Sequence, residues 1–205
     1  MDRAGTATAT DSLSVRFGVF WRVLLAGAVI GVVSVGVGSR LLMFLLIRMN
    51  PDAGGIVTDD GFEMGRFTVS GSLNLAFVGL LFGLLSGVLY LLLEPLLIGP
   101  PWFQTLSLSV GAGTVAASQL VHSDGVDFHV LDPYWFAVLL FTLFPIAYVA
   151  VVDRTVRWIR RRGGTSAPVA PPVVGWVLRG LLAVLFVLAA VSLASDVSAL
   201  HDLNG

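Results

Sequence analysis

The sequence predicts an all-α membrane protein with five transmembrane helices and a small extracytoplasmic cap of loops, and three observations predict this class. Hydrophobic residues make up 56% of the chain and charged residues only 12%, whereas a soluble domain holds roughly a quarter charged residues. The apolar residues gather in five stretches, each long enough to cross a bilayer as a helix, which takes about 20 residues. The loops after the first and third stretches are acidic, whereas the loop before the last stretch is basic.

The five stretches divide the chain into spans and tails. Residues 1–15 are polar and small, and we expect a disordered cytoplasmic tail there. The transmembrane domain covers 16–195, and residues 196–205 form an extracytoplasmic tail. The first stretch exceeds the apolar run of about 7 to 15 residues in a cleavable signal peptide, so we expect it to be retained. The predicted spans are Phe17 to Ile47, Leu73 to Ile98, Phe103 to Val121, Tyr134 to Val152 and Val173 to Ala194.

The arginines predict the orientation, because cytoplasmic flanks of membrane helices hold an excess of basic residues. With a cytoplasmic N-terminus, that side receives Arg3, Arg16, Arg22, Arg154, Arg157, Arg160, Arg161, Arg162 and Arg179. The other side receives Asp52, Asp59, Asp60, Glu63, Asp124, Asp127, Asp132, Asp196 and Asp202, opposed by Arg48 and Arg66. We therefore expect a multi-pass protein of the cell membrane with its C-terminus outside.

Glycines at helical spacing predict where spans one and two pack, since small residues allow close backbone approach in lipid. Gly79, Gly83 and Gly87 recur every four residues in span two, as in a glycine zipper, and the inner end of the same face is polar. An arc of span one offers the matching surface, and we expect the two to meet there. That arc contains Gly27, Gly31, Ser34 and Gly38.

Two charged residues lie inside the predicted spans. Arg40 is near the outer interface, so we expect it to extend to the headgroups or to contact an acidic outer loop. Glu94 lies at the inner end of span two, in the opposite leaflet, and cannot pair with Arg40. Its expected partner is Arg16 or Arg179.

Span three is the least hydrophobic span and carries a polar stripe. Such a stripe either joins helices by hydrogen bonds or lines a water-filled path. We keep both interpretations, together with Glu94 as a buried polar residue of such a path. The stripe consists of Gln104, Ser107, Gly111, Thr114 and Ser118.

Span four is predicted to begin with Asp132 as N-cap and Pro133 in the first turn, and to kink at Pro145. The arginines that follow it attract anionic lipid headgroups, whereas nucleic acid is a poor alternative. These arginines are Arg154, Arg157, Arg160, Arg161 and Arg162.

The outer loops carry the candidate metal ligands. Asp60 and Gly61 lie between two short β-prone runs and predict a β-hairpin. In the next loop, His122, Asp127 and His129 are weak candidates for a metal site, because zinc takes imidazole and carboxylate ligands. Ordinary loop roles explain the same residues. We therefore predict no committed metal site, no cofactor and no catalytic residue, and we lean against an enzyme.

The motif Asp60-Gly61-Phe62 with Gly65 and Thr68, followed by 125–128 (Gly-Val-Asp-Phe) leading to Asp132-Pro133, resembles a group of uncharacterised multi-pass membrane proteins from actinobacteria. The resemblance covers spans one to four and implies the topology. It brings no activity.

The leading functional prediction is a non-catalytic interaction or scaffold component of the membrane, with the outer cap as its contact surface. Its partner would be a membrane protein or a second copy of the chain. One alternative is a small transport or channel component that uses Glu94 and the polar face of span three. The other is an extracytoplasmic metal-binding enzyme or sensor.

Overall fold

In the computed structural model, every regular element of the described residues is a helix. The structure describes residues 3–57, 66, 68–123, 125, 128, 130–165, 168 and 170–204, with side chains described within 14–203. The elements are α1 (Arg3–Gly31), the π-helix η1 (Val32–Gly38), α2 (Ser39–Met49), the 3₁₀ turn η2 (Pro51–Ala53), α3 (Val69–Leu93), the 3₁₀ turn η3 (Glu94–Leu96), α4 (Pro101–Ala117), α6 (Tyr134–Gly163) and α7 (Pro172–Asn204).

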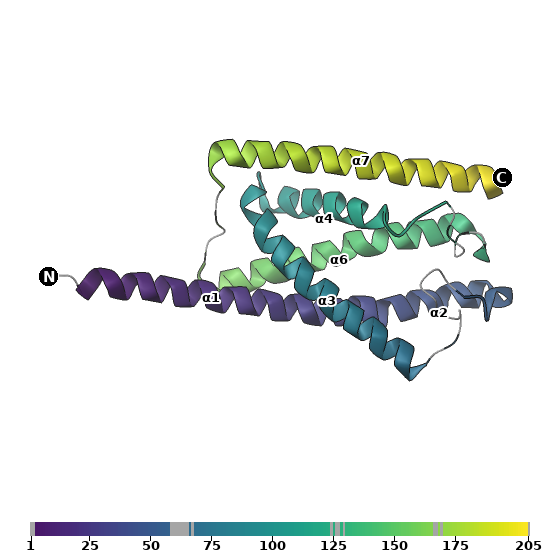
Figure 1. The fold of residues 1–205 in the computed structure, drawn as a ribbon, viewed down its shortest axis with the longest axis horizontal. Helices are drawn as coiled ribbons and strands as arrows, with labels where there is room; N and C mark the ends of the chain where they lie inside the picture. Colours follow the sequence, from purple (N-terminus) through teal and green to yellow (C-terminus); the bar gives the residue numbers. More distant parts are fainter. Residues whose placement is uncertain are drawn as a thin grey trace.

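α1 and α2 run in the same direction through η1, and from there α3, α4, α6 and α7 run in alternate directions along the bundle (Figure 1). α3 crosses the α1 helix obliquely, α4 and α6 lie side by side, and α7 lies along the edge next to α4. The two termini lie at opposite ends of the bundle. We call the end that holds the last turns of α6 the arginine end, and the end that holds η2 and the first turn of α6 the loop end.

Four segments are long and apolar enough to cross a membrane: Ser14–Met49, Val69–Leu96, Tyr134–Gly163 and Pro172–Leu203. This confirms the all-α membrane class. The stretch predicted as span three forms α4, which has 17 residues and ends at Ala117, not at Val121. The structure also continues α1 back to Arg3, through most of the segment predicted as a disordered tail. No proline or glycine lies between Thr6 and Phe17 to end a helix.

The backbones of α1 and α3 approach each other through glycines. A Cβ atom built on Gly27 would lie 2.4 Å from the carbonyl oxygen of Gly83, and one on Gly31 would lie 2.1 Å from that of Gly79. Any larger side chain at these positions would push the helices apart. The contact at Gly87 is looser, since a Cβ atom built there would lie 3.4 Å from the carbonyl oxygen of Val23.

Beyond Gly31 the arc predicted from α-helical spacing is wrong. The chain continues as the π-helix η1, in which the amide of Ser39 bonds the carbonyl of Ser34, five residues back. A π-helix makes i→i+5 hydrogen bonds and so rotates the following residues relative to an α-helix. As a result Gly36 faces Ala76 of α3, whereas Gly38 faces Phe144 of α6.

A second apolar core closes the loop end. It joins α2, η2, Phe128, Leu131, the first turns of α6 and the last turns of α7, and Val121, Ala137 and Leu200 are fully buried in it. α6 begins at Tyr134 with Pro133 as the N-cap residue. The prediction of Asp132 as N-cap is therefore wrong by one residue, and the amide of Asp132 instead donates to the Asn50 side chain at 2.7 Å. The turn of the predicted β-hairpin, Asp60 and Gly61, lies outside the described residues.

Candidate functional site

The arginine end contains a network of buried charged and polar side chains between α3, α4 and α6. Asp153 of α6 is its centre, with 0% of the residue exposed. Isolated charges are rarely buried within membrane helices, since a charge away from water must be paired or hydrogen-bonded. The surroundings of Asp153 meet this demand.

Three helices supply partners to the Asp153 carboxylate. Its Oδ1 accepts a hydrogen bond from the Tyr90 hydroxyl of α3 at 2.8 Å. Its Oδ2 accepts one from the Thr105 hydroxyl of α4 at 2.5 Å. Arg157, one turn later on α6, donates Nε to both oxygens at 2.9 and 2.8 Å. The carboxylate thus ties α3 and α4 to α6.

Gln104 extends the network to the surface of the arginine end. Its Oε1 accepts from Arg157 Nη1 at 3.0 Å, while its Nε2 donates to the Gly99 carbonyl at 2.8 Å. Gln104 lies in the first turn of α4 because Pro101 occupies N1, where proline is favoured. This side chain therefore links the α3–α4 connection to the buried ion pair.

Glu94 forms the second ion pair of the network. Its Oε2 accepts from Nη2 of Arg160, and both side chains are largely buried, at 5% and 14% exposure. The predicted partners, Arg16 and Arg179, are both wrong. Arg179 donates instead to the Leu96 carbonyl at 2.8 Å. Arg160 follows Arg157 by three residues on the same side of α6, so the α6 face that carries Asp153 also reaches η3.

A neutral hydrogen bond continues the polar face of α3 toward the middle of the bundle. The hydroxyls of Ser86 and Tyr148 lie 2.7 Å apart, between α3 and α6. The Ser86 hydroxyl also donates to the Gly83 carbonyl of its own helix at 2.9 Å. Ser86, Tyr90 and Glu94 recur every four residues, so the polar face predicted for this helix is directed against α6.

The residues of the polar stripe predicted on span three differ in exposure, and they do not share one site. Ser107 is exposed and donates to the Gln104 carbonyl of its own helix at 3.2 Å. Thr114 and Ser118 are buried, and Ser118 likewise donates to its own helix, at Val115. Gly111 faces open space. Of this stripe, Gln104 alone joins the charge network.

Arg40 is buried in α2, with 7% of the residue exposed. This burial contradicts the expectation that it extends into the headgroup region. Its Nη1 lies 3.5 Å from the carbonyl oxygen of Arg66, in the connection between α2 and α3, so Arg40 contacts this loop through a backbone carbonyl. The rotation introduced by η1 explains the inward position, because it changes the face on which every residue after Gly38 lies.

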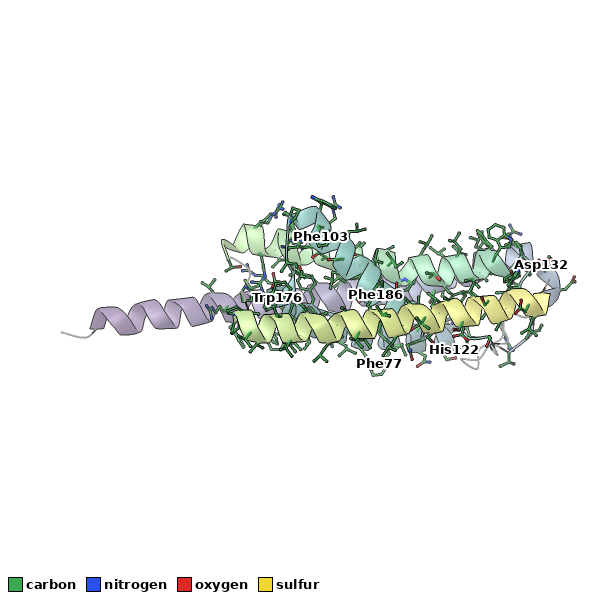
Figure 2. The ribbon with its side chains drawn as sticks, turned by 90° about the horizontal axis from the view of Figure 1, so that it is seen from above. Phe77, Phe103, His122, Asp132, Trp176 and Phe186 are labelled. Atoms are coloured by element: carbon green, nitrogen blue, oxygen red, sulfur yellow. The ribbon has the colours of Figure 1, made fainter. Side chains whose placement is uncertain are left out.

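The predicted metal ligands of the outer loop are only partly described. His122 is exposed, and Asp127 and His129 lie outside the described residues. Figure 2 places His122 and Asp132 at the loop end, opposite Trp176. Among the residues described, no group of three His, Asp or Glu side chains is placed to hold a metal ion. The metal site stays a prediction.

Sequence reasoning missed Asp153 as the centre of the network. It treated 153–162 as a basic surface segment, although Asp153 is the one acidic residue in that run and lies one turn before Arg157. An acid and an arginine at i and i+4, beside a polar α3 face, were the available signal. The structure pairs Arg157 and Arg160 with carboxylates, so the predicted lipid contact is left to the other three arginines of the segment.

The network contains two carboxylates and two guanidinium groups, so their formal charges cancel. Both carboxylates accept hydrogen bonds from within the chain, and the bonds of the network join three helices. Chemically, this arrangement holds the arginine end together.

No protein-family model, curated protein or solved structure matches this chain. The resemblance to an actinobacterial group stays a prediction.

Proposed function

We propose that this chain is a non-catalytic membrane protein that binds or stabilises another membrane component. The observation that supports this function is the internal pairing of the buried charges. Asp153 and Glu94 each pair with an arginine of α6. A transport site needs a polar group that exchanges partners with a solute or with protons. Here the buried carboxylates instead form ion pairs with arginines of the same chain, and these pairs stabilise the helix bundle.

The proposed topology has five crossings, with α4 as the third. α4 has 17 residues, which corresponds to about 26 Å of helix, close to the hydrocarbon thickness of about 30 Å. It packs closely against α6, since a Cβ atom on Gly113 would lie 2.5 Å from Ile146. An odd number of crossings agrees with termini at opposite ends (Figure 1). The arginine end is proposed to be cytoplasmic.

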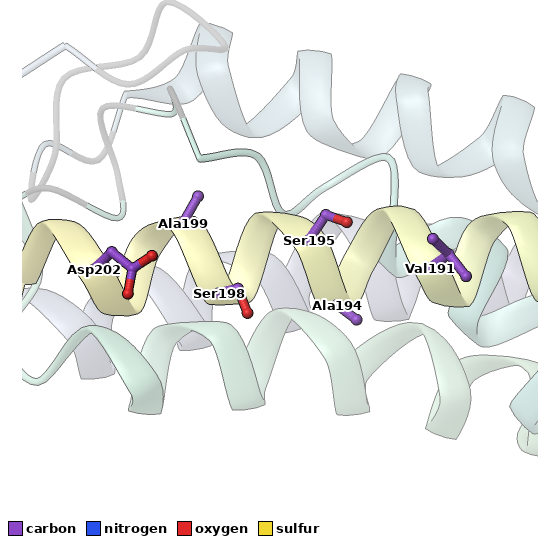
Figure 3. Close-up of a pocket in the computed structure, with 6 residues that line it drawn as sticks. All are labelled: Val191, Ala194, Ser195, Ser198, Ala199 and Asp202. Carbon is purple, nitrogen blue, oxygen red and sulfur yellow. The ribbon is translucent and has the colours of Figure 1, made fainter.

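The proposed contact surface is the loop end, where α7 carries a shallow open groove (Figure 3). Four of its six lining residues are alanine or serine, which suits close approach of another helix. The groove adjoins the loop-end core, into which Leu200 of α7 is buried. The β-hairpin predicted over 56–69 belongs to the same proposed cap. The groove is lined by Val191, Ala194, Ser195, Ser198, Ala199 and Asp202.

The transport alternative has less support. Glu94, its proposed ionisable residue, is paired with Arg160. Ser107 and Ser118, its proposed polar lining, donate to carbonyls of their own helix. An α-helical hydroxyl bonded in this way offers little to a passing solute. The metal-binding alternative depends on Asp127 and His129 and is tested by metal analysis of the purified protein.

The test is affinity purification of the tagged full-length protein from its own membranes in mild detergent, followed by native mass spectrometry. We expect a stoichiometric protein partner or a defined homo-oligomer. A double variant, Ala194→Phe with Ser198→Phe, fills the groove and should release that partner. The matched control is Leu85→Phe, at an exposed position of α3, and it should retain the partner.

A monomer without any protein partner, combined with solute flux in proteoliposomes, would overturn the proposed function. Release by the control variant as well as by the groove variant would overturn the choice of surface only. Single cysteines test the topology separately, because the chain has no cysteine of its own. Thr165→Cys and His201→Cys should react with a membrane-impermeant maleimide from opposite sides of the membrane, and labelling of both from the same side would contradict five crossings.

A further inference from the structure

The arginine end divides its arginines into two sets that differ in exposure. Arg157 and Arg160 face into the bundle, where they pair with Asp153 and Glu94. Three further arginines of the same helix are exposed, and at about 100° per residue they lie outside the arc of the buried pairs, on the flank and far side of α6. These exposed arginines are the ones placed to bind an anion from outside the chain. They are Arg154, Arg161 and Arg162.

A second helix adds basic side chains to this surface. α1 meets the end of α6 where a Cβ atom on Gly163 would lie 3.6 Å from Val19. Arg16 and Arg22 stand three residues before and after Val19, and both are exposed. The arginines of α1 therefore flank the level at which α6 ends. The fold thus brings together basic groups from opposite halves of the sequence.

Exposed tryptophans lie at the level of these arginines and indicate that a membrane interface lies there. Trp21 of α1 is 48% exposed and Trp158 of α6 is 53% exposed. The guanidinium of Arg162 lies over the Trp158 ring, 4.1 Å from its centroid. Tryptophan concentrates at the headgroup level of bilayers. The exposed arginines are thus placed where lipid phosphates lie.

Among the side chains that the structure describes at this end, both carboxylates are buried and paired, and the exposed charged residues are all arginines. We propose that this two-helix surface binds the headgroups of anionic phospholipids. Arg157 and Arg160 take no part in the contact. Charge complementarity and the tryptophan level both favour a lipid over a soluble anion. The contact is made by Arg16, Arg22, Arg154, Arg161 and Arg162.

The experiment titrates the full-length protein in detergent with phosphatidylglycerol or phosphatidylcholine and counts bound lipids by native mass spectrometry. The wild type should prefer phosphatidylglycerol. The triple variant Arg154→Gln, Arg161→Gln and Arg162→Gln should bind it roughly fivefold more weakly for each arginine removed. The control is Arg48→Gln, an exposed arginine at the loop end, which should leave the preference unchanged.

Sodium chloride supplies a test that needs no variant, because the preference of the wild type should fall as salt screens the exposed charges. Equal binding of both lipids by the wild type would overturn the proposal. So would a triple variant with unchanged preference, a salt-independent preference, or an equal loss in Arg48→Gln. Competition by inorganic phosphate at millimolar concentration would overturn it too, by assigning the site to a soluble anion.

Discussion

Tyr90 and Asp153 lie on different helices, 63 positions apart in the chain, and the tyrosine hydroxyl donates to the buried carboxylate at 2.8 Å. This bond joins α3 to α6 at the point where the arginine end changes from apolar packing to charge pairing. The same carboxylate holds Thr105 of α4. One carboxylate thus bonds to side chains of three helices, and its contribution to the free energy of unfolding can be measured.

Asp153→Asn should destabilise the protein by about 3 kcal/mol, because it leaves Arg157 in a largely buried position without a carboxylate. The asparagine has nearly the same volume, so packing is preserved. Reversible unfolding in mixed micelles measures the change in the free energy of unfolding. Asp52→Asn, at an exposed aspartate of the loop end, is the control and should change stability by less than about 0.5 kcal/mol. Equal effects in both variants would contradict the central role of Asp153.

The pair of Glu94 and Arg160 should show coupling in a double-mutant cycle. Glu94→Gln and Arg160→Gln each leave one buried charge alone, whereas the double variant removes both charges. We expect the double variant to be more stable than the sum of the single effects predicts, by about 1 to 3 kcal/mol. Additive effects would mean that the two side chains contribute independently. The measurement is the same unfolding assay, with Arg48→Gln as a reference for loss of an exposed arginine.

The hydrophobic pattern was sufficient to predict the helices, because each apolar stretch is long enough to be recognised without its neighbours. Ion-pair partners were not predictable in this way. The partner of Glu94 depends on which helix lies beside η3, and Arg16, Arg160 and Arg179 were all at a suitable depth. The spacing of Asp153 and Arg157 indicated an ion pair, but the burial of Asp153 depends on its contacts with α3 and α4, which that spacing does not reveal.

The glycine contact between α1 and α3 should respond to single methyl groups. Gly83→Ala would place a Cβ atom 2.2 Å from the Gly27 carbonyl oxygen, so the helices must separate. We expect a loss of about 1 to 3 kcal/mol in the free energy of unfolding. Gly111→Ala of α4 is the matched control, because nothing lies within 4 Å of its added Cβ. The control should be neutral or slightly stabilising, and a loss of the same size there would show that the effect does not come from the helix contact.

The π-helix η1 is the element that sequence spacing could not predict, since Val32–Gly38 holds no proline or charged residue to mark a break in the apolar run. Its consequence is that Gly36 faces Ala76, where a Cβ atom on Gly36 would lie 3.8 Å from that of Ala76. This separation matches the mean Cβ distance of about 3.8 Å in disulfides. The chain has no cysteine, so Gly36→Cys with Ala76→Cys should form one intramolecular disulfide on mild oxidation. A mobility shift and mass spectrometry of the linked peptides measure it.

The control for this crosslink is Ser34→Cys with Ala76→Cys. A continuous α-helix would place Ser34 on the arc of Gly27 and Gly31, so it would favour the control pair. The π-helix favours Gly36, because the extra rotation accumulates between Gly31 and Ser39. Faster oxidation of the Ser34 pair would therefore contradict the π-helix η1. It would favour a continuous α-helix, in which Arg40 points away from the face of Gly27 and Gly31. Preferential linkage through Gly36 would instead explain, by one helix geometry, both the burial of Arg40 and the contact of Gly38 with α6.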